Sequence, residues 1–281
     1  MPHTTLPKKK YRYMLEHEAG ENEATRLALQ NKIFGPNTAD FLAKNITTGM
    51  KVLVAGCGTG EELVIISHLV GPEGAVIGID SNPQQIEQAN FTIQQHKLKN
   101  TSATVKDLHK AKDIGTDFNF IFTRFVLVHL QNPMLALESL YRSLAPTGKL
   151  ACEESYFSAA YCQPPLKCFT QHMFLLITLS KKLGINFDIG PELKLLFTKL
   201  KLEDISSYAT QVVMTDPEDK QIAPLSAEAL AETYYAHKLI TEEEMKKLLT
   251  QLWEEMVLKP HEVGQVAMHH TIGTKPLHPK L

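Results

Sequence analysis

The chain has 281 residues, of which 43% are hydrophobic, and its formal net charge at pH 7 is −2. This near-neutral balance excludes the strongly basic character of proteins that bind nucleic-acid backbones, so we expect no nucleic acid as a partner. The longest apolar run, at residues 173–177, is too short to cross a bilayer, and we expect no membrane span. The four cysteines show no paired spacing and the first 20 residues lack the apolar region of a signal peptide, which predicts reduced thiols and a cytoplasmic protein.

The predicted elements begin with a helical segment over residues 11–45. Short apolar runs then predict five strands, at 51–55, 75–79, 101–105, 118–122 and 149–153. Helical periodicity fills the gaps between them, and two of these helices begin at Asn-Pro pairs, Asn82-Pro83 and Asn132-Pro133. Strands joined by short crossover helices predict a parallel, doubly wound α/β sheet.

The C-terminal part of the chain predicts further helices and two more strands. We expect helices within 164–200 and at 226–238, and strands at about 202–213 and 263–272. Thr241 with Glu244 three residues later predicts a capping box that begins another helix.

Polar and glycine residues follow four of the predicted strands. The loop with Gly56, Gly58 and Gly60 follows the first strand, and Asp80, Asp107 and Arg124 follow the second, third and fourth. Ligands of open parallel sheets bind beyond the carboxyl ends of the strands, so we expect these residues to converge. Asp80 lies 22 residues after Gly58, which is close to the spacing of ~20 expected for a carboxylate that binds ribose hydroxyls.

The sequence after the glycines narrows the type of ligand. The loop reads G-x-G-x-G, unlike the G-x-G-x-x-G of dinucleotide sites, and Glu61 and Glu62 follow it directly. Two carboxylates in the first turn of a helix oppose its dipole favourably but repel a pyrophosphate. This pattern favours an adenosyl ligand without phosphate, and S-adenosyl-L-methionine fits that description.

The order of these motifs resembles that of the class I S-adenosylmethionine-dependent methyltransferases. The resemblance covers about residues 48–155 and is carried by VLVAGCGTG, VIGIDSNP, VKDL, FNFIFTRFVLVHLQNP and SLAPTGKL. Two later segments, DIGPELKLLF and QIAPLSAEAL, resemble a bacterial small-molecule methyltransferase subgroup. The family implies a Rossmann-like doubly wound, mostly parallel seven-stranded sheet with an antiparallel last strand, and added helices that form a lid.

The resemblance also implies a domain organisation and a set of cofactor contacts. We expect one methyltransferase domain over 1–281, with a helical cap at 1–45, a cofactor-binding core at 46–155, a helical substrate lid with a sixth strand at 156–260 and a final strand at 261–275. Asp80 is expected to bind the ribose hydroxyls and Asp107 the adenine amino group. The full set of expected cofactor contacts is Gly56, Cys57, Gly58, Gly60, Asp80, Ser81, Gln85, Lys106, Asp107, Leu108, Arg124 and Phe125.

One position departs from the family pattern. The family usually has Asp or Glu two residues before the first glycine of the loop, where this chain has Val54. Either another residue replaces that acid, or the affinity for the cofactor is lower, or activity is lost. Glu16, Glu18 and Glu23 are candidates for the replacement.

No sequence pattern marks one residue as a general base. Methyl transfer from a sulfonium mainly requires orientation and a dry cavity, and a base is needed only if the acceptor must lose a proton. His129, Glu153 and Tyr156 are the candidates, with Glu154 beside them. The acceptor is expected to be a small or lipid-like molecule, and a dimer is left open.

Two other residue patterns and one alternative hypothesis bear on the function. The spacing of Cys162, Cys168 and His172 matches no common zinc pattern, so no metal is expected. Tyr234 and Lys238 have the Y-x-x-x-K spacing of short-chain dehydrogenases, which leaves an NAD(P)-dependent oxidoreductase as an alternative, although we interpret the pair as chance spacing on a helix. A noncatalytic protein that binds an adenosyl ligand is the third hypothesis, motivated by Val54.

Overall fold

The computed structural model describes residues 21–108 and 114–278, and the described residues form two compact units. The sheet unit comprises residues 36–156, 184–211 and 267–278, and the helical unit comprises residues 21–35, 157–183 and 212–266. Helix α1 (Glu21–Asn45) contributes to both and carries Pro36 at the change of unit. The segment boundaries expected from the sequence stay a prediction.

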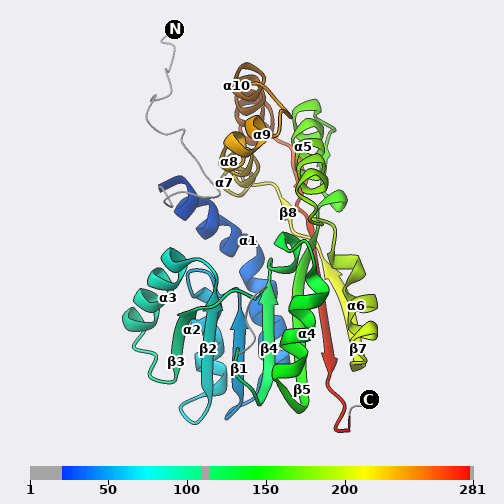
Figure 1. Cartoon of the computed structure of the whole chain (residues 1–281). Coiled ribbons are helices and arrows are strands. Elements are labelled where there is room, and N and C mark those ends of the chain that lie inside the picture. The colour runs from blue at the N-terminus through cyan, green and yellow to red at the C-terminus, as the bar shows by residue number, and fades with distance from the viewer. Residues whose placement is uncertain (1–20, 109–113, 279–281) are drawn as a thin grey trace. The chain divides into compact units, whose positions relative to one another are not determined.

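The sheet unit is built on a seven-stranded sheet with the order β3-β2-β1-β4-β5-β10-β7 (Figure 1). Its strands are β1 (Lys51–Ala55), β2 (Ala75–Asp80), β3 (Thr101–Val105), β4 (Phe118–Arg124), β5 (Leu144–Tyr156), β7 (Glu203–Thr210) and β10 (Ala267–Thr274). The strands from β3 to β5 pair in parallel, and β10 runs antiparallel to both of its neighbours. The predicted fold class is confirmed, including the antiparallel last strand.

The helices of the sheet unit lie between its strands in the chain. They are α2 (Glu61–Val70), α3 (Pro83–Gln95), α4 (Pro133–Ser143) and α6 (Leu193–Lys199), with short 3₁₀ turns η1 (Leu127–His129) and η3 (Gly190–Glu192). Asn82 caps α3 by accepting a hydrogen bond from the Gln84 amide. α4 also begins at its predicted Asn-Pro pair, with Asn132 at the N-cap and Pro133 directly after it, although the Asn132 side chain makes no capping bond.

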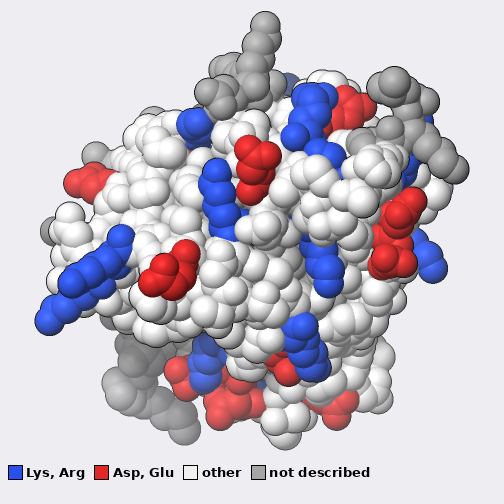
Figure 2. Space-filling view, turned by 90° about the horizontal axis from the view of Figure 1, so that it is seen from below, with Lys and Arg blue, Asp and Glu red and all other residues white. Residues whose placement is uncertain are grey.

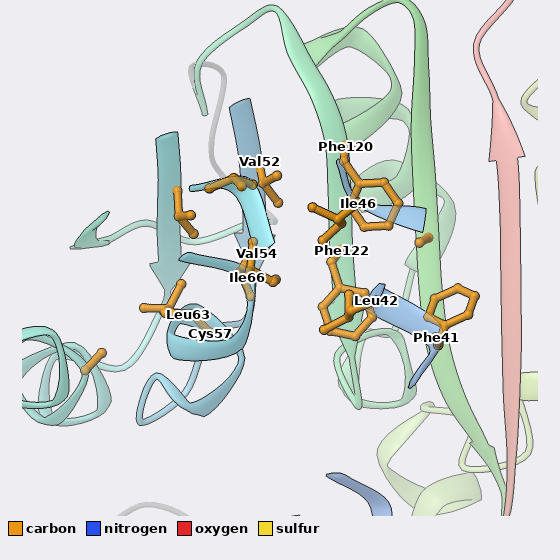
Figure 3. Close-up of a cluster of buried hydrophobic side chains, with 14 of the residues drawn as sticks. Phe41, Leu42, Ile46, Val52, Val54, Cys57, Leu63, Ile66, Phe120 and Phe122 are labelled. Carbon is orange, nitrogen blue, oxygen red and sulfur yellow. The ribbon is translucent and has the colours of Figure 1, made fainter. Parts of the chain in front are cut away.

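The core of the sheet unit explains why residues 52–55 of the first strand are all apolar. Val52 and Val54 on β1 share a face with Phe120 and Phe122 on β4, and the two strands are in direct register. Side chains from α1, α2 and α3 complete this cluster, which Figure 3 shows in close-up. A strand in the middle of a parallel sheet is covered on both faces and therefore lacks an alternating pattern.

The helical unit holds a second, smaller sheet that the sequence did not predict. Its three antiparallel strands have the order β6 (Tyr161–Gln163), β9 (Glu262–Gly264) and β8 (Val213–Met214). Its helices are η2 (Phe157–Ala159), α5 (Lys167–Leu183), α7 (Pro217–Lys220), α8 (Ile222–Ala229), α9 (Ala231–Ala236), α10 (Glu242–Gln251) and the π-helix η4 (Leu252–Val257). The capping box of Thr241 and Glu244 at the start of α10 is confirmed.

Several boundaries differ from the predictions. The helix expected at 226–238 is divided into α8 and α9 at Leu230. The last strand expected at 263–272 is divided into β9 and β10, which belong to different sheets, and the fifth strand begins at Leu144 instead of residue 149.

Among the described residues, no helix combines the length and the apolar character needed to cross a membrane. On the face of the molecule shown in Figure 2, Lys and Arg side chains are interspersed with Asp and Glu side chains.

Candidate functional site

The three glycines of the loop after β1 have different structural roles. All three have positive φ, at 77°, 50° and 95° for Gly56, Gly58 and Gly60. A Cβ at Gly56 would lie 2.2 Å from the Cγ2 atom of Val126, and one at Gly60 would lie 3.2 Å from the Cα atom of Ala89. A Cβ at Gly58 would meet only the Gln85 side chain, at 3.7 Å. Gly56 and Gly60 therefore permit close packing, while a Cβ at Gly58 would only reach ordinary contact with one side chain.

The amide groups of the loop are used inside the protein. Gly56 and Cys57 both donate to the Ile79 carbonyl, at 2.7 and 3.0 Å, and Gly58 donates to the Asp80 carboxylate at 3.1 Å. The Cys57 side chain is buried, and burial raises the pKa of its thiol to about 12. A phosphate-binding loop presents free amide groups to its anion. This loop has committed these three, which agrees with the sequence argument against a pyrophosphate.

Asp80 ends β2 beside the loop and is oriented by two backbone amides. Its Oδ2 atom accepts from Gly58 at 3.1 Å and its Oδ1 atom accepts from Asn82 at 2.9 Å. A carboxylate has about four acceptor positions, so about two stay available for a pair of hydroxyl groups. Ser81 is exposed and Gln85 half-buried on the same segment.

The segment after β3 lies beside Asp80. The Lys106 amide donates to the Asp80 carbonyl at 2.8 Å, and the half-buried Asp107 and the buried Leu108 follow directly. The structure thus brings the ends of β1, β2 and β3 together as the sequence predicted for a parallel sheet.

Arg124 ends β4 next to the glycine loop, and Phe125 follows it directly. The Arg124 guanidinium forms an ion pair with Glu62 on α2, and the two side chains are 10% and 9% exposed. Arg124 also donates to the Thr38 hydroxyl at 3.3 Å. Phe125 has φ of 53°, a conformation that costs a non-glycine residue about 1–3 kcal/mol and is concentrated at functional sites.

Beyond Arg124 the contacts continue into a buried polar cluster. The Thr38 hydroxyl donates to Glu153 Oε2 at 2.6 Å, and the Glu153 Oε1 atom lies 2.7 Å from His270 Nδ1. His270 Nε2 lies 2.8 Å from the Thr210 hydroxyl, and Tyr208 stacks on its ring. Glu153 is fully buried with both carboxylate oxygens engaged.

The neighbouring Glu154 fixes the turn that follows β4. Its carboxylate accepts from the amides of Val126, Leu127 and Val128 at 3.0, 2.8 and 3.3 Å. Burial nevertheless raises the pKa of Glu154 to about 7, because desolvation outweighs these three bonds. Sequence reasoning placed Glu154 beside the candidates for a general base and missed this role, since a strand pattern does not reveal backbone partners.

The other two candidates for a general base are accessible. His129 in η1 is exposed, and its ring meets the edge of the Phe187 ring at a centroid distance of 6.2 Å. Tyr156 at the end of β5 is half-buried and contacts His269. Both lie at carboxyl ends of the parallel strands or just beyond them.

Residues weighed for other functions lie in the helical unit. Tyr234 on α9 is fully buried, and burial raises the pKa of its hydroxyl. Lys238 lies beyond the end of α9 with φ of 54°, and it lines a surface hollow together with Tyr235. Tyr234 and Lys238 therefore share neither one helix nor one site. No group of three His, Cys, Asp or Glu side chains in the described part of the chain is arranged to hold a metal ion. Glu16, Glu18 and the side chain of Glu23 lie outside the described residues.

A family model described as "Methyltransferase domain" matches residues 46–183. Residues 46–183 are a class I methyltransferase domain. This methyltransferase domain contains every predicted cofactor contact and all three predicted candidates for a general base.

Two curated relatives support the same family. An uncharacterized methyltransferase of Schizosaccharomyces pombe is 30% identical over 130 residues, which cover 44% of this chain and 46% of the relative. A demethylmenaquinone methyltransferase of a Geobacillus strain is 26% identical over 127 residues, covering 45% of this chain and 52% of the relative. The chain thus matches about half the length of these relatives.

A solved structure shows the same fold. It is a phosphoethanolamine N-methyltransferase of Haemonchus contortus, in complex with phosphomonomethylethanolamine and S-adenosylhomocysteine. The TM-score is 0.57 at 16% identity, and the match covers 91% of this chain and 58% of that one.

Proposed function

We propose that this protein transfers a methyl group from S-adenosyl-L-methionine to a small-molecule acceptor. The observation that carries the proposal is the junction of Gly58 and Asp80. It combines an open backbone face with a carboxylate that is held by two amides and keeps acceptor positions for two hydroxyls.

The residues present fit this cofactor. Asp80 would hold the ribose, Asp107 and Leu108 would border the adenine, and Gly58 would admit the ligand against the backbone. The loop amides shown to be bonded internally favour a ligand without phosphate, and the structural relative binds S-adenosylhomocysteine. When bound, the sulfonium of the cofactor supplies the methyl group.

The acceptor is proposed as a small molecule because both named relatives act on one. Demethylmenaquinone and a phosphoethanolamine derivative differ greatly in polarity, so the acceptor atom is left open. His129 and Tyr156 are the better candidates for moving a proton, because both carboxylate oxygens of Glu153 are engaged. A cytoplasmic location, the exclusion of nucleic acid, a dimer and the subgroup assignment stay predictions.

Calorimetric titration with S-adenosylhomocysteine tests the proposal. Asp80→Ala should weaken binding at least about tenfold, because it removes charge-assisted bonds to the ribose and the anchor of Gly58. Glu87→Ala is the matched control, because Glu87 is an exposed acid on α3, and it should bind like the wild type.

Three outcomes would contradict the proposal or a part of it. Binding of NADH or NADPH in place of S-adenosylhomocysteine would support the oxidoreductase alternative. Wild-type affinity in Asp80→Ala would remove the assignment of the ribose site, and an absence of heat with any adenosyl ligand would overturn the proposed function as a whole.

A further inference from the structure

The position of the missing acid is occupied by the hydrophobic core. Val54 is 2% exposed and packs in the cluster that includes Leu63, Ile66 and Phe122 (Figure 3). A carboxylate at this position would be desolvated in an apolar surrounding. Any acidic contact to the amino-acid end of the cofactor must therefore come from another element.

Glu62 supplies a carboxylate close to the same loop. It lies in the first turn of α2, two residues after Gly60, and its side chain is 9% exposed. Its partner Arg124 ends β4, which is the direct neighbour of β1 in the sheet. The packing of Gly56 against Val126 confirms that the loop and the segment after Arg124 touch.

The Arg124 side of the ion pair is held by a hydroxyl group. Thr38 accepts from Arg124 and donates to Glu153, so the guanidinium is oriented by a second buried carboxylate through one hydroxyl. Burial raises the pKa of Glu62, and the Arg124 charge opposes that change. Burying an ion pair usually contributes little to stability because of the cost of desolvation, so a role in recognition has to be considered.

The charges of this pair match those of an amino acid. At neutral pH the methionine end of the cofactor carries an α-ammonium and an α-carboxylate on one carbon atom. A guanidinium binds a carboxylate through two parallel hydrogen bonds, and a carboxylate accepts from an ammonium group.

We propose that Glu62 and Arg124 together bind the amino-acid end of S-adenosylmethionine, with Glu62 at the ammonium and Arg124 at the carboxylate. Glu62 thereby replaces the acid that the family usually has at position 54. This inference rests on the proposed function and adds two residues with defined roles to its site.

A comparison of two ligands on the wild-type protein tests the inference without a mutation. S-adenosylhomocysteine carries the amino-acid end, whereas 5′-methylthioadenosine has the same adenosine and thioether but lacks it. Calorimetry should give an affinity for S-adenosylhomocysteine at least about a hundredfold higher, since two charge-assisted contacts are lost with the smaller ligand.

A double variant assigns the difference to the ion pair. Glu62→Gln with Arg124→Gln removes both charges of the pair together. It should weaken S-adenosylhomocysteine about tenfold to a hundredfold and leave 5′-methylthioadenosine within about twofold. The matched control is Glu138→Gln with Arg142→Gln, the same exchange at an exposed pair on α4, which should change neither affinity.

The outcomes separate the inference from the proposed function. If the wild type binds neither ligand, the proposed function fails and this inference fails with it. If the wild type binds both ligands equally, or if the double variant weakens both equally, this inference alone is overturned, because the pair then acts only on the fold. Equal binding of the two ligands by the wild type overturns the inference even if the double variant does not fold.

Discussion

Val54 has a different role in the structure from the one that its sequence position suggested. From the sequence it marked a missing contact to the cofactor, and in the structure it is a core side chain of β1 in one cluster with Leu63 and Ile66 of α2. The sequence could show that an acid was absent, but not that Glu62 lies buried nearby in an ion pair with Arg124.

Restoring the acid at this position should harm the protein. We expect Val54→Asp to lower the free energy of unfolding by about 2–4 kcal/mol, because it buries an unpaired carboxylate. Urea unfolding measures the loss. Val105→Asp makes the same exchange at a 48% exposed position on β3 and should cost less than about 1 kcal/mol. A Val54→Asp protein of normal stability that binds S-adenosylhomocysteine more tightly would show that the core accepts the acid as a ligand contact.

The adjacent acids Glu153 and Glu154 show a limit of prediction at this scale. Neighbouring strand residues point to opposite faces, so the sequence could place the two carboxylates on different sides. It could not identify their partners, because His270 lies 117 residues away from Glu153 and the donors to Glu154 are backbone amides of a turn. Partners at such sequence distances become visible only in the folded chain.

At the level of elements, the glycine loop offers a test with a matched pair. Gly56→Ala should destabilise the protein by about 2–4 kcal/mol, because its Cβ would collide with Val126 at a positive φ. Gly58→Ala should cost only about 1–2 kcal/mol, since at a φ near 50° its Cβ would make only an ordinary contact with the Gln85 side chain.

The two variants should rank in the opposite order for the loss of ligand affinity. Gly58→Ala places a methyl group on the open face of the loop and should weaken S-adenosylhomocysteine at least about tenfold, while folded Gly56→Ala protein keeps more of its affinity. Urea unfolding and calorimetry together give the two rankings. Equal affinities for wild type and Gly58→Ala would show that the ligand does not approach this face.

The sheet elements were predicted well because each has a local signal. β1 and β3 have the predicted bounds, and the two caps with side-chain bonds, at Asn82 and Thr241, follow known residue preferences. The small sheet was missed because β6, β8 and β9 have three residues or fewer, too short for any periodicity. The break between α8 and α9 was missed because it contains neither glycine nor proline.

At the scale of the whole molecule, the division into two units could not be predicted from the sequence. The helical unit is assembled from segments that are separated in the chain by parts of the sheet unit. Local patterns identify helices, but they do not tell which distant segments pack together. The helical unit also buries ionisable groups: burial lowers the pKa of His172 to about 4 and raises the pKa of Glu228 to about 7.

His172 makes the stability of the helical unit depend on pH. Its ring is buried, and its Nδ1 atom has no hydrogen-bond partner within the described residues. The unfolded chain binds a proton at this residue near pH 6.5, whereas the folded protein does so only near pH 4. The contribution of His172 is therefore complete above pH 6.5 and is lost as the pH falls toward 4.

Removing the imidazole should flatten this dependence. Between pH 6.5 and pH 4, we expect the wild type to lose about 3 kcal/mol more of its free energy of unfolding than His172→Leu does. The single tryptophan, Trp253, lies in η4 of the helical unit, so its fluorescence during urea unfolding reports on the unit that contains His172. His237→Leu removes a half-buried histidine from the same unit and should follow the wild type. Parallel pH profiles for wild type and His172→Leu would mean that the folded protein takes up the proton as readily as the unfolded chain, and that His172 is reached by water in solution.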